Sequence, residues 1–237
     1  MNLYVAIDIL ILAFPLALSF DRRVRYFRSW PFVGLAAVLI GAPFVAWDSV
    51  MTVNGAWGFS PEYAGSLRIL SLPLGELGFF LAVPFSCLFI YEVVAAYAPD
   101  REHRGDGSTR HRGVLPWAAA AVALAVAAFA LRSRLYTSTV LAAAAVFLLL
   151  AVLLRPGLLA SRRFWLTVAL AYIPFLIFNG LLTALPVVTY GEKAILGPRL
   201  LTIPVEDFLY SFSLLGLTVL AYELVRGRST RSYAPSR

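Results

Sequence analysis

Seven long apolar stretches constrain this chain more than any other feature of its sequence. They cover residues 2–20, 30–47, 71–97, 114–131, 136–154, 164–187 and 200–225. A helix needs roughly 20 such residues to cross about 30 Å of hydrocarbon, where no water can satisfy an open backbone. Continuous apolar runs exclude a β-barrel, because barrel strands alternate apolar and polar residues. The sequence therefore predicts an all-α fold, a polytopic membrane bundle of about seven transmembrane helices.

Composition and charge distribution support a membrane protein and exclude a soluble globule. Hydrophobic residues make up 60% of the chain, charged residues 14%, and the mean hydropathy is +0.80. The net charge of +7 does not indicate nucleic-acid binding, because the basic residues lie in loops, at helix ends or in the tail. The loops after the first, third and fifth stretches, together with the tail, hold 15 of the 20 Lys and Arg residues. By the positive-inside rule we expect a multi-pass protein of the cell membrane, with the N-terminus outside and the C-terminus in the cytoplasm.

A segment before the third stretch recurs 131 residues later without a gap. Residues 68–76 (RILSLPLGE) align with residues 199–207 (RLLTIPVED), and the same register carries Tyr-Glu at 91–92 onto Tyr-Glu at 222–223. Composition alone makes apolar residues match in any two membrane helices, but it does not match an Arg, a Pro, an acid and a Tyr-Glu pair. We therefore expect a duplicated unit with a functional site at the interface of its copies.

The offset divides the chain into four parts. Residues 1–98 form the first copy and residues 132–226 the second, each with three spans. Residues 99–131 are predicted to form a cytoplasmic loop and a linker helix, and residues 227–237 a disordered cytoplasmic tail. Three spans alone would leave the second copy upside down, and one added helix restores its orientation. The predicted arrangement is a 3+1+3 parallel internal repeat.

An acid follows a proline at the start of the last span of each copy. Pro73 and Pro204 suit the first turn of a helix, which places Glu76 and Asp207 about one turn inside the outer end. A helix N-terminus favours a carboxylate, whereas burial in an apolar site disfavours it. We expect burial to prevail, aided by the like charge of Glu206, so that at least one carboxyl holds a proton at neutral pH. Acids within a membrane indicate function by default; the alternative is that they cap their helices or pair with the arginines of the repeated segment.

Aromatic residues surround these acids. The second stretch ends in Trp-Asp at residues 47–48, and the counterpart at residues 178–179 is Phe-Asn. Candidate residues for an aromatic binding wall are Trp47, Trp57, Phe79, Phe80, Phe208 and Tyr210. Each of them alone is explained by core packing or by an interfacial belt. Beside buried acids, however, aromatic faces attract positive charge, and a proton donor with aromatic walls suits chemistry through carbocations.

These elements together resemble the lycopene cyclase domain family, bacterial and archaeal lycopene β-cyclases that often consist of two small membrane subunits. The family's pattern is Pro-x-Glu-(Glu/Asp) opening a span, followed by aromatics and a Tyr-Glu, with a Trp-Asp upstream. Residues 204–207 match it fully and residues 47–48 match the upstream element, whereas residues 73–76 match in part because Gly75 stands where the first acid is expected. The resemblance covers essentially the whole chain, as two subunit-like halves fused through the fourth helix.

The resemblance implies an enzyme of carotenoid biosynthesis, an intramolecular lyase or isomerase. It would close the ψ-ends of lycopene into β-ionone rings, giving γ- or β-carotene, by protonation at C2 and without redox change. Placed on this chain, Glu206 or Asp207 is the predicted general acid, Glu76 its partner or base, and Asp48 an orienting or relay group. The missing acid at Gly75 predicts an asymmetric site in which the second half supplies the proton. The implied partners are lycopene, membrane lipid and other enzymes of the carotenoid pathway, with no nucleic acid.

The sequence identifies no cofactor and leaves two other functions open. It has no Gly-x-Gly-x-x-Gly fingerprint, which argues against a flavoprotein cyclase. His103 and His111 lie among arginines without acidic or Cys residues at useful spacing, so we expect no metal site. A small transporter of the SWEET type shares the 3+1+3 topology, although it has paired Pro-Gln elements that this chain lacks and fold does not carry function. A cyclase of longer C50 carotenoids would carry the same motifs.

Overall fold

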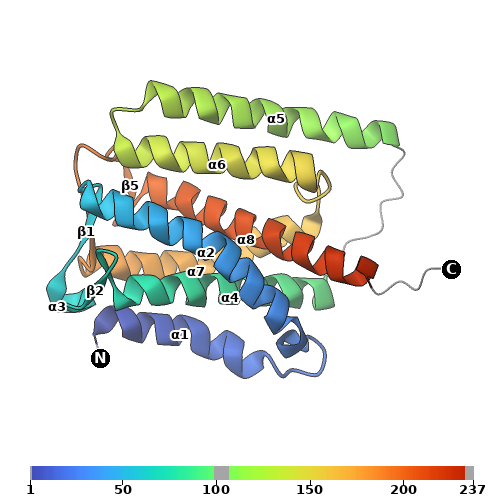
Figure 1. The fold of residues 1–237 in the computed structure, drawn as a ribbon, viewed down its shortest axis with the longest axis horizontal. Coiled ribbons are helices and arrows are strands. Elements are labelled where there is room, and N and C mark those ends of the chain that lie inside the picture. The colour runs from blue at the N-terminus through green and yellow to red at the C-terminus, as the bar shows by residue number, and fades with distance from the viewer. Residues whose placement is uncertain (1, 99–106, 233–237) are drawn as a thin grey trace.

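The helices of this protein lie side by side in one bundle (Figure 1). The structure is a computed structural model that describes residues 2–98 and 107–232, with side chains described outside residues 107–112 and 228–232. Its helices are α1 (Leu3–Leu18), α2 (Trp30–Val53), α3 (Pro61–Ala64), α4 (Leu74–Tyr97), α5 (Gly107–Ala130), α6 (Leu135–Leu154), α7 (Arg162–Ala184) and α8 (Val205–Ser232). A single 3₁₀ turn, η1 (Tyr26–Ser29), precedes α2. The predicted all-α class is confirmed.

Six helical segments within the described residues are long and apolar enough to cross a membrane. They are Tyr26–Val53, Leu74–Tyr97, Gly113–Ala130, Leu135–Leu154, Arg162–Ala184 and Val205–Gly227. The one predicted span that is not among these six is the first, α1. It is apolar but has only 16 residues, or roughly 24 Å at 1.5 Å per residue. It therefore falls short of a full crossing perpendicular to the bilayer.

Several predicted boundaries differ from those of the structure. Helix α5 begins at Gly107 although the sequence predicts a loop up to 113, and α8 continues to Ser232 beyond the predicted start of the tail. The rest of the predicted loop, 99–106, and of the tail, 233–237, lies outside the described residues. Helix α2 runs on to Val53, and its last turns bury Asp48 and Met51.

Short antiparallel strands gather at one end of the bundle, where α4 and α8 begin (Figure 1). The strands are β1 (Trp57–Phe59), β2 (Arg68–Ile69), β3 (Leu72–Pro73), β4 (Val188–Tyr190), β5 (Arg199–Leu200) and β6 (Ile203–Pro204). They pair as β1 with β4, β2 with β3, and β5 with β6. The predicted third and last spans therefore begin at Leu74 and Val205, because a tight turn with positive φ at Leu70 (52°) and Leu201 (55°) occupies the residues before them.

The two halves correspond element by element at the offset of 131. With this shift β1 falls on β4, β2 on β5 and β3 on β6. Strand β1 pairs antiparallel with its counterpart β4, and Gly58 lies opposite Thr189, which is its own counterpart. Such pairing is what a two-fold axis through that residue pair would produce. Helix packing follows the same rule, since α2 packs on α8 as α7 packs on α4.

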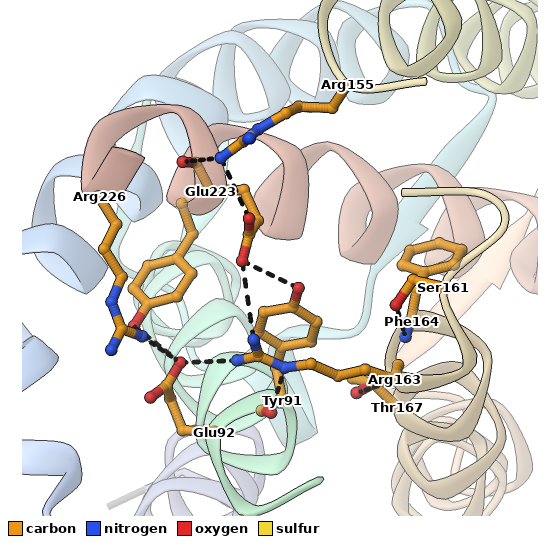
Figure 2. Close-up of polar contacts among 10 residues, drawn as sticks. Tyr91, Glu92, Arg155, Ser161, Arg163, Phe164, Thr167, Glu223 and Arg226 are labelled. Atoms are coloured by element: carbon orange, nitrogen blue, oxygen red, sulfur yellow. Dashed lines mark hydrogen bonds and ion pairs between the residues drawn. The ribbon is translucent and has the colours of Figure 1, made fainter. Parts of the chain in front are cut away.

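The opposite end of the bundle is held by a reciprocal polar network (Figure 2). The Tyr91 hydroxyl donates to Glu223 Oε1 and the Tyr222 hydroxyl donates to Glu92 Oε1, each at a distance of 3.0 Å. Arg163 Nη2 donates to Glu92 Oε1 at 2.8 Å, and Arg163 Nη1 lies 3.8 Å from Glu223 Oε1. Each glutamate thus binds the tyrosine of the other half, and α7 contributes the arginine that bridges them.

Candidate active site

A cavity of about 570 Å³ lies between α1, α4, α7 and α8. Strands β1 and β4 and the first turn of α6 close it at the end where α4 and α8 begin, through Trp57, Tyr190 and Tyr136. Glu76 and Asp207 both line this closed end. The rest of the wall is mainly apolar, so the cavity is an apolar channel with both carboxyls at one end.

Glu76 comes from the first turn of α4, directly after the β2–β3 ribbon. It is 7% exposed and accepts a hydrogen bond of 2.5 Å from the hydroxyl of Tyr4. Asp48 and Asp8 are both close enough to interact electrostatically with Glu76. Among the described residues no Lys or Arg forms an ion pair with any of these three acids. Glu76 therefore stands in a group of buried carboxyls that no Lys or Arg of the described residues pairs with.

Asp207 occupies the corresponding position on α8 but has different neighbours. It is 4% exposed and accepts three hydrogen bonds. The donors are the Tyr136 hydroxyl at 2.7 Å, the Tyr190 hydroxyl at 2.6 Å and Asn179 Nδ2 at 2.8 Å. Burial, followed by the charge of Asp207, raises the pKa of the Tyr190 phenol well above its ordinary value, so that this phenol stays a hydrogen-bond donor at neutral pH. Burial opposes ionisation of Asp207, and these three hydrogen bonds act against it by favouring the carboxylate.

Glu206 faces away from the cavity although it is adjacent to Asp207. Its Oε1 accepts from Thr137 Oγ1 at 2.6 Å and from the Leu196 N–H at 2.7 Å, which ties α8 to α6 and to the loop before β5. Neighbouring helical residues point about 100° apart, so only one of the two acids can face the channel. Glu206 does not line the cavity.

Asp48 lies behind Glu76 rather than in the cavity wall. It is 1% exposed, and its Oδ1 accepts a hydrogen bond of 2.6 Å from Trp57 Nε1. Its counterpart at the 131-residue offset is Asn179, which donates to Asp207. Each wall acid thus has a polar neighbour from the preceding span, a carboxyl in the first half and an amide in the second.

Packing explains why a glycine, and not an acid, occupies position 75. A Cβ added at Gly75 would run into the ring of Tyr4, the residue that donates to Glu76. The first half therefore has no room for a side chain at the position that Glu206 occupies in the second.

The predicted arginine partners do not meet the acids. Arg68 Nη1 donates to the Gly65 carbonyl at 2.5 Å, and Arg199 Nη1 donates to the Thr202 carbonyl at 2.8 Å. Arg199 thus binds the turn of its repeated segment, whereas Arg68 binds the backbone just before its own. The described residues contain no ion pair between either arginine and Glu76 or Asp207.

The predicted aromatic residues divide into three groups. Trp57, Phe79 and Tyr210 line the cavity. Trp47 and Phe80 pack behind it around Phe44, with ring centroids 5.2 and 6.4 Å from that ring. Phe208 packs on Tyr172 and Phe175 of α7 and does not line the cavity itself.

Sequence reasoning missed two tyrosines that hold the wall acids. Tyr4 donates to Glu76 and Tyr136 to Asp207, each from the first turn of the first helix of its half. The two positions differ by 132 rather than 131 residues, so a comparison at one fixed offset pairs Tyr4 with Leu135 instead. A search for a tyrosine near the start of the first and fifth spans would have found both.

Comparison with known families decides the relationship of the chain. A family model described as lycopene cyclase matches residues 1–94 and 133–225. The chain belongs to the lycopene cyclase family. Neither curated proteins nor solved structures gave a match. Membership supports a general role as an enzyme of carotenoid cyclisation with a carotenoid substrate, in accordance with the resemblance. The apolar helices agree with the expected association with a membrane.

Proposed function

We propose that this member of the lycopene cyclase family is a lycopene β-cyclase, which closes ψ-ends into β-rings by acid catalysis without redox change. One observation carries the proposal: a single apolar cavity holds two carboxyls, Glu76 and Asp207, at its closed end. Tyr190 and Tyr210 interact electrostatically with both acids, so the two belong to one site. An apolar channel suits a hydrocarbon substrate, and paired carboxyls suit the donation and removal of a proton.

Glu76 is the proposed general acid. Like charges at short range in a medium of low dielectric constant oppose ionisation, and Glu76 has Asp48 and Asp8 as neighbours with no paired cation in the described part of the chain. A carboxyl group in this setting retains a proton that it can give to a substrate. Asp48, outside the wall, is proposed as a positioning group that holds this proton on Glu76. These roles reverse the sequence-based expectation, which assigns the proton to the second half.

Asp207 is the proposed base. It accepts hydrogen bonds from Tyr136, Tyr190 and Asn179, and three donors stabilise a carboxylate. As an anion it also offsets positive charge that develops on the substrate. Glu206 is less favoured as either acid or base, because it does not line the cavity and its Oε1 is engaged by Thr137 and Leu196.

The proposed reaction balances without any other reactant. The Glu76 proton adds to C2 of the ψ-end and leaves a tertiary cation at C1. The electrons of the C5=C6 double bond attack C1, which forms the C1–C6 bond and moves the cation to C5. Asp207 removes the proton from C6, and the electrons of that bond form the C5=C6 double bond of the β-ring. One proton enters and one leaves, so the reaction is an isomerisation and needs no oxidant, and we propose that it needs no redox cofactor.

The aromatic wall supports the cationic intermediates. The rings of Trp57, Phe79 and Tyr210 line the cavity near the two carboxyls, and ring faces attract cations. The apolar wall and the β1–β4 pair also keep water away from a cation that water would trap as an alcohol. These features support cyclisation rather than hydration.

We also propose that the chain is a 3+1+3 internal duplication with both acid ends on the outer side of the membrane. The correspondence of the strands at 131 residues and their pairing about Gly58 and Thr189 support the duplication. The two matched segments have nearly equal lengths and leave out residues 95–132, which contain the whole of α5. The distribution of Lys and Arg supports an outside N-terminus and a cytoplasmic C-terminus.

Expression in lycopene-accumulating bacteria, with pigment analysis by chromatography, tests the proposal. We expect γ- or β-carotene to replace lycopene. Unchanged lycopene alongside full accumulation of the protein would contradict it. Parallel hosts that make C50 carotenoid precursors, and uptake assays in proteoliposomes, distinguish the longer-substrate and transporter alternatives. The closed acid end of the cavity argues against a path for solute across the bundle.

A further inference from the structure

We infer that one end of the polyene enters the cavity sideways from the membrane hydrocarbon, between α1 and α7, and that one end is cyclised in each binding event. The inference rests on the proposed cyclase function and adds to it the route of the substrate and the order of the two ring closures. The cavity is closed at the end that holds Glu76 and Asp207 and open at its side, along α1.

The wall of the cavity opens at α1. Leu10 and Phe14 line the cavity, yet they are 60% and 67% exposed. Phe89 and Leu182, which line the same cavity from α4 and α7, are only 5% and 3% exposed. Leu10 and Phe14 therefore form a rim, where the cavity meets the outside of the bundle. Helix α1 packs mainly on α4 and only weakly on α7, so the opening lies between α1 and α7.

The rim faces hydrocarbon rather than water. Leu10 and Phe14 lie six and ten residues after Tyr4, or roughly 9 and 15 Å along the helix from the acid end. These positions lie in the hydrocarbon core, within the leaflet next to the acid end. A polyene dissolved among the lipid tails can reach such an opening without crossing the head groups.

The corresponding flank of the other half is filled. At the 131-residue offset the wall residue Ser211 corresponds to Phe80, and the wall residues Phe175 and Phe178 correspond to Phe44 and Trp47. Around Tyr210 these bulky rings pack on one another, with centroid distances of 5.5 Å from Phe44 and 5.2 Å from Trp47. Among the described residues, only the flank between α1 and α7 is thus open to a substrate, and Glu76 and Asp207 both line the cavity behind it.

The channel has reactive groups at one end alone. Its wall on α4 extends from Glu76 to Ile90, 14 residues or roughly 21 Å away, and no further acid among the described side chains lines it. A linear polyene carries its two reactive ends at opposite tips. When one tip lies at Glu76 and Asp207, the other tip lies at or beyond the rim. The second ring therefore requires release, reversal and a second insertion.

Substitutions at the rim test the route. We expect Leu10→Trp to lower the initial rate of lycopene cyclisation about tenfold, since it narrows the opening. Val146→Trp is the matched control, because Val146 is 49% exposed on the corresponding helix α6 and does not line the cavity. Phe14→Ala removes bulk from the same rim and should raise the initial rate, which keeps the test decisive if the tryptophan variant does not accumulate. Equal rates for Leu10→Trp and Val146→Trp, or a rate for Phe14→Ala at or below wild type, would overturn the sideways route.

A pulse of deuterated lycopene followed by excess unlabelled lycopene tests the order of ring closure in the unmodified enzyme. We expect the label present at the chase to stop in the monocyclic product, because release precedes the second closure. Passage of the label into bicyclic product without a monocyclic stage would overturn one-ended cyclisation. Absence of any ring would contradict the proposed function itself, so the two failures are distinguishable.

Discussion

Glu76 and Asp207 hold corresponding positions in the two halves of the molecule but have different neighbours. Asp48 and Asp8 lie near Glu76, whereas Tyr136, Tyr190 and Asn179 all donate hydrogen bonds to Asp207. Acids at corresponding helix starts are therefore proposed to take opposite tasks, because other helices supply them with different neighbours. In the proposed mechanism the neighbours of the two acids, above all Asp48 and Asn179, separate the proton donor from the acceptor.

The largest effect is expected from removal of the proposed donor. Glu76→Gln keeps the size of the side chain and the hydrogen bond from Tyr4 but has no acidic proton, so cyclisation should fall by about 10³-fold or more. Pigment analysis together with an immunoblot of the membrane fraction measures activity per molecule of enzyme. Cyclisation near the wild-type rate would show that the two halves do not differ as proposed.

Exchange of the acidic neighbour should produce a smaller effect with a distinctive pH dependence. In Asp48→Asn an amide replaces the like charge beside Glu76, so Glu76 ionises more readily and activity should be lost at a lower pH than in the wild type. At neutral pH we expect a loss of about tenfold, or ~1.4 kcal/mol in activation free energy. The measurement is a pH–rate profile of the enzyme in detergent. A profile with unchanged shape would assign Asp48 a purely structural role.

The packing of Tyr4 against Gly75 predicts a loss of stability. In Gly75→Ala the new methyl group would run into the Tyr4 ring, which should lower the free energy of unfolding by about 1–3 kcal/mol. Gly34→Ala is the matched control, since a Cβ at Gly34 of α2 meets no atom within 4 Å. Thermal denaturation in detergent compares the two. Equal midpoints would contradict the steric account of why the first half has no acid at this position.

The smallest effect on chemistry is expected at the second acid of the matched motif. Glu206→Gln keeps an oxygen that accepts from Thr137 and Leu196, so cyclisation should stay within about threefold of wild type, below 1 kcal/mol. Rate measurements in membranes, normalised to protein, are sufficient. Complete loss of cyclisation in a variant that accumulates normally would return the proton donor to the second half.

The sequence predicts the helices well because the bilayer requires them, and the seven apolar stretches leave little alternative. It also indicates the acids through their repetition. It cannot tell that Asp207 faces the cavity and Glu206 does not, because the two differ by one residue and their directions depend on how α8 is rotated in the bundle. The β1–β4 pair could not be predicted either, since each strand has three residues and its partner lies in the other half. Tyr4 and Tyr136 were missed because a one-residue shift hides their equivalence.

Ring closure in D₂O tests the central claim, that a buried carboxyl donates the proton that begins cyclisation. A deuteron on Glu76 would add to C2, and the proton lost from C6 was never exchanged. Mass spectrometry of the product of the wild-type enzyme should therefore find one deuterium per ring, and the Glu76→Gln enzyme should form rings more slowly by about 10³-fold or more. Rings without deuterium, or labelled rings formed at the wild-type rate by Glu76→Gln, would contradict the account.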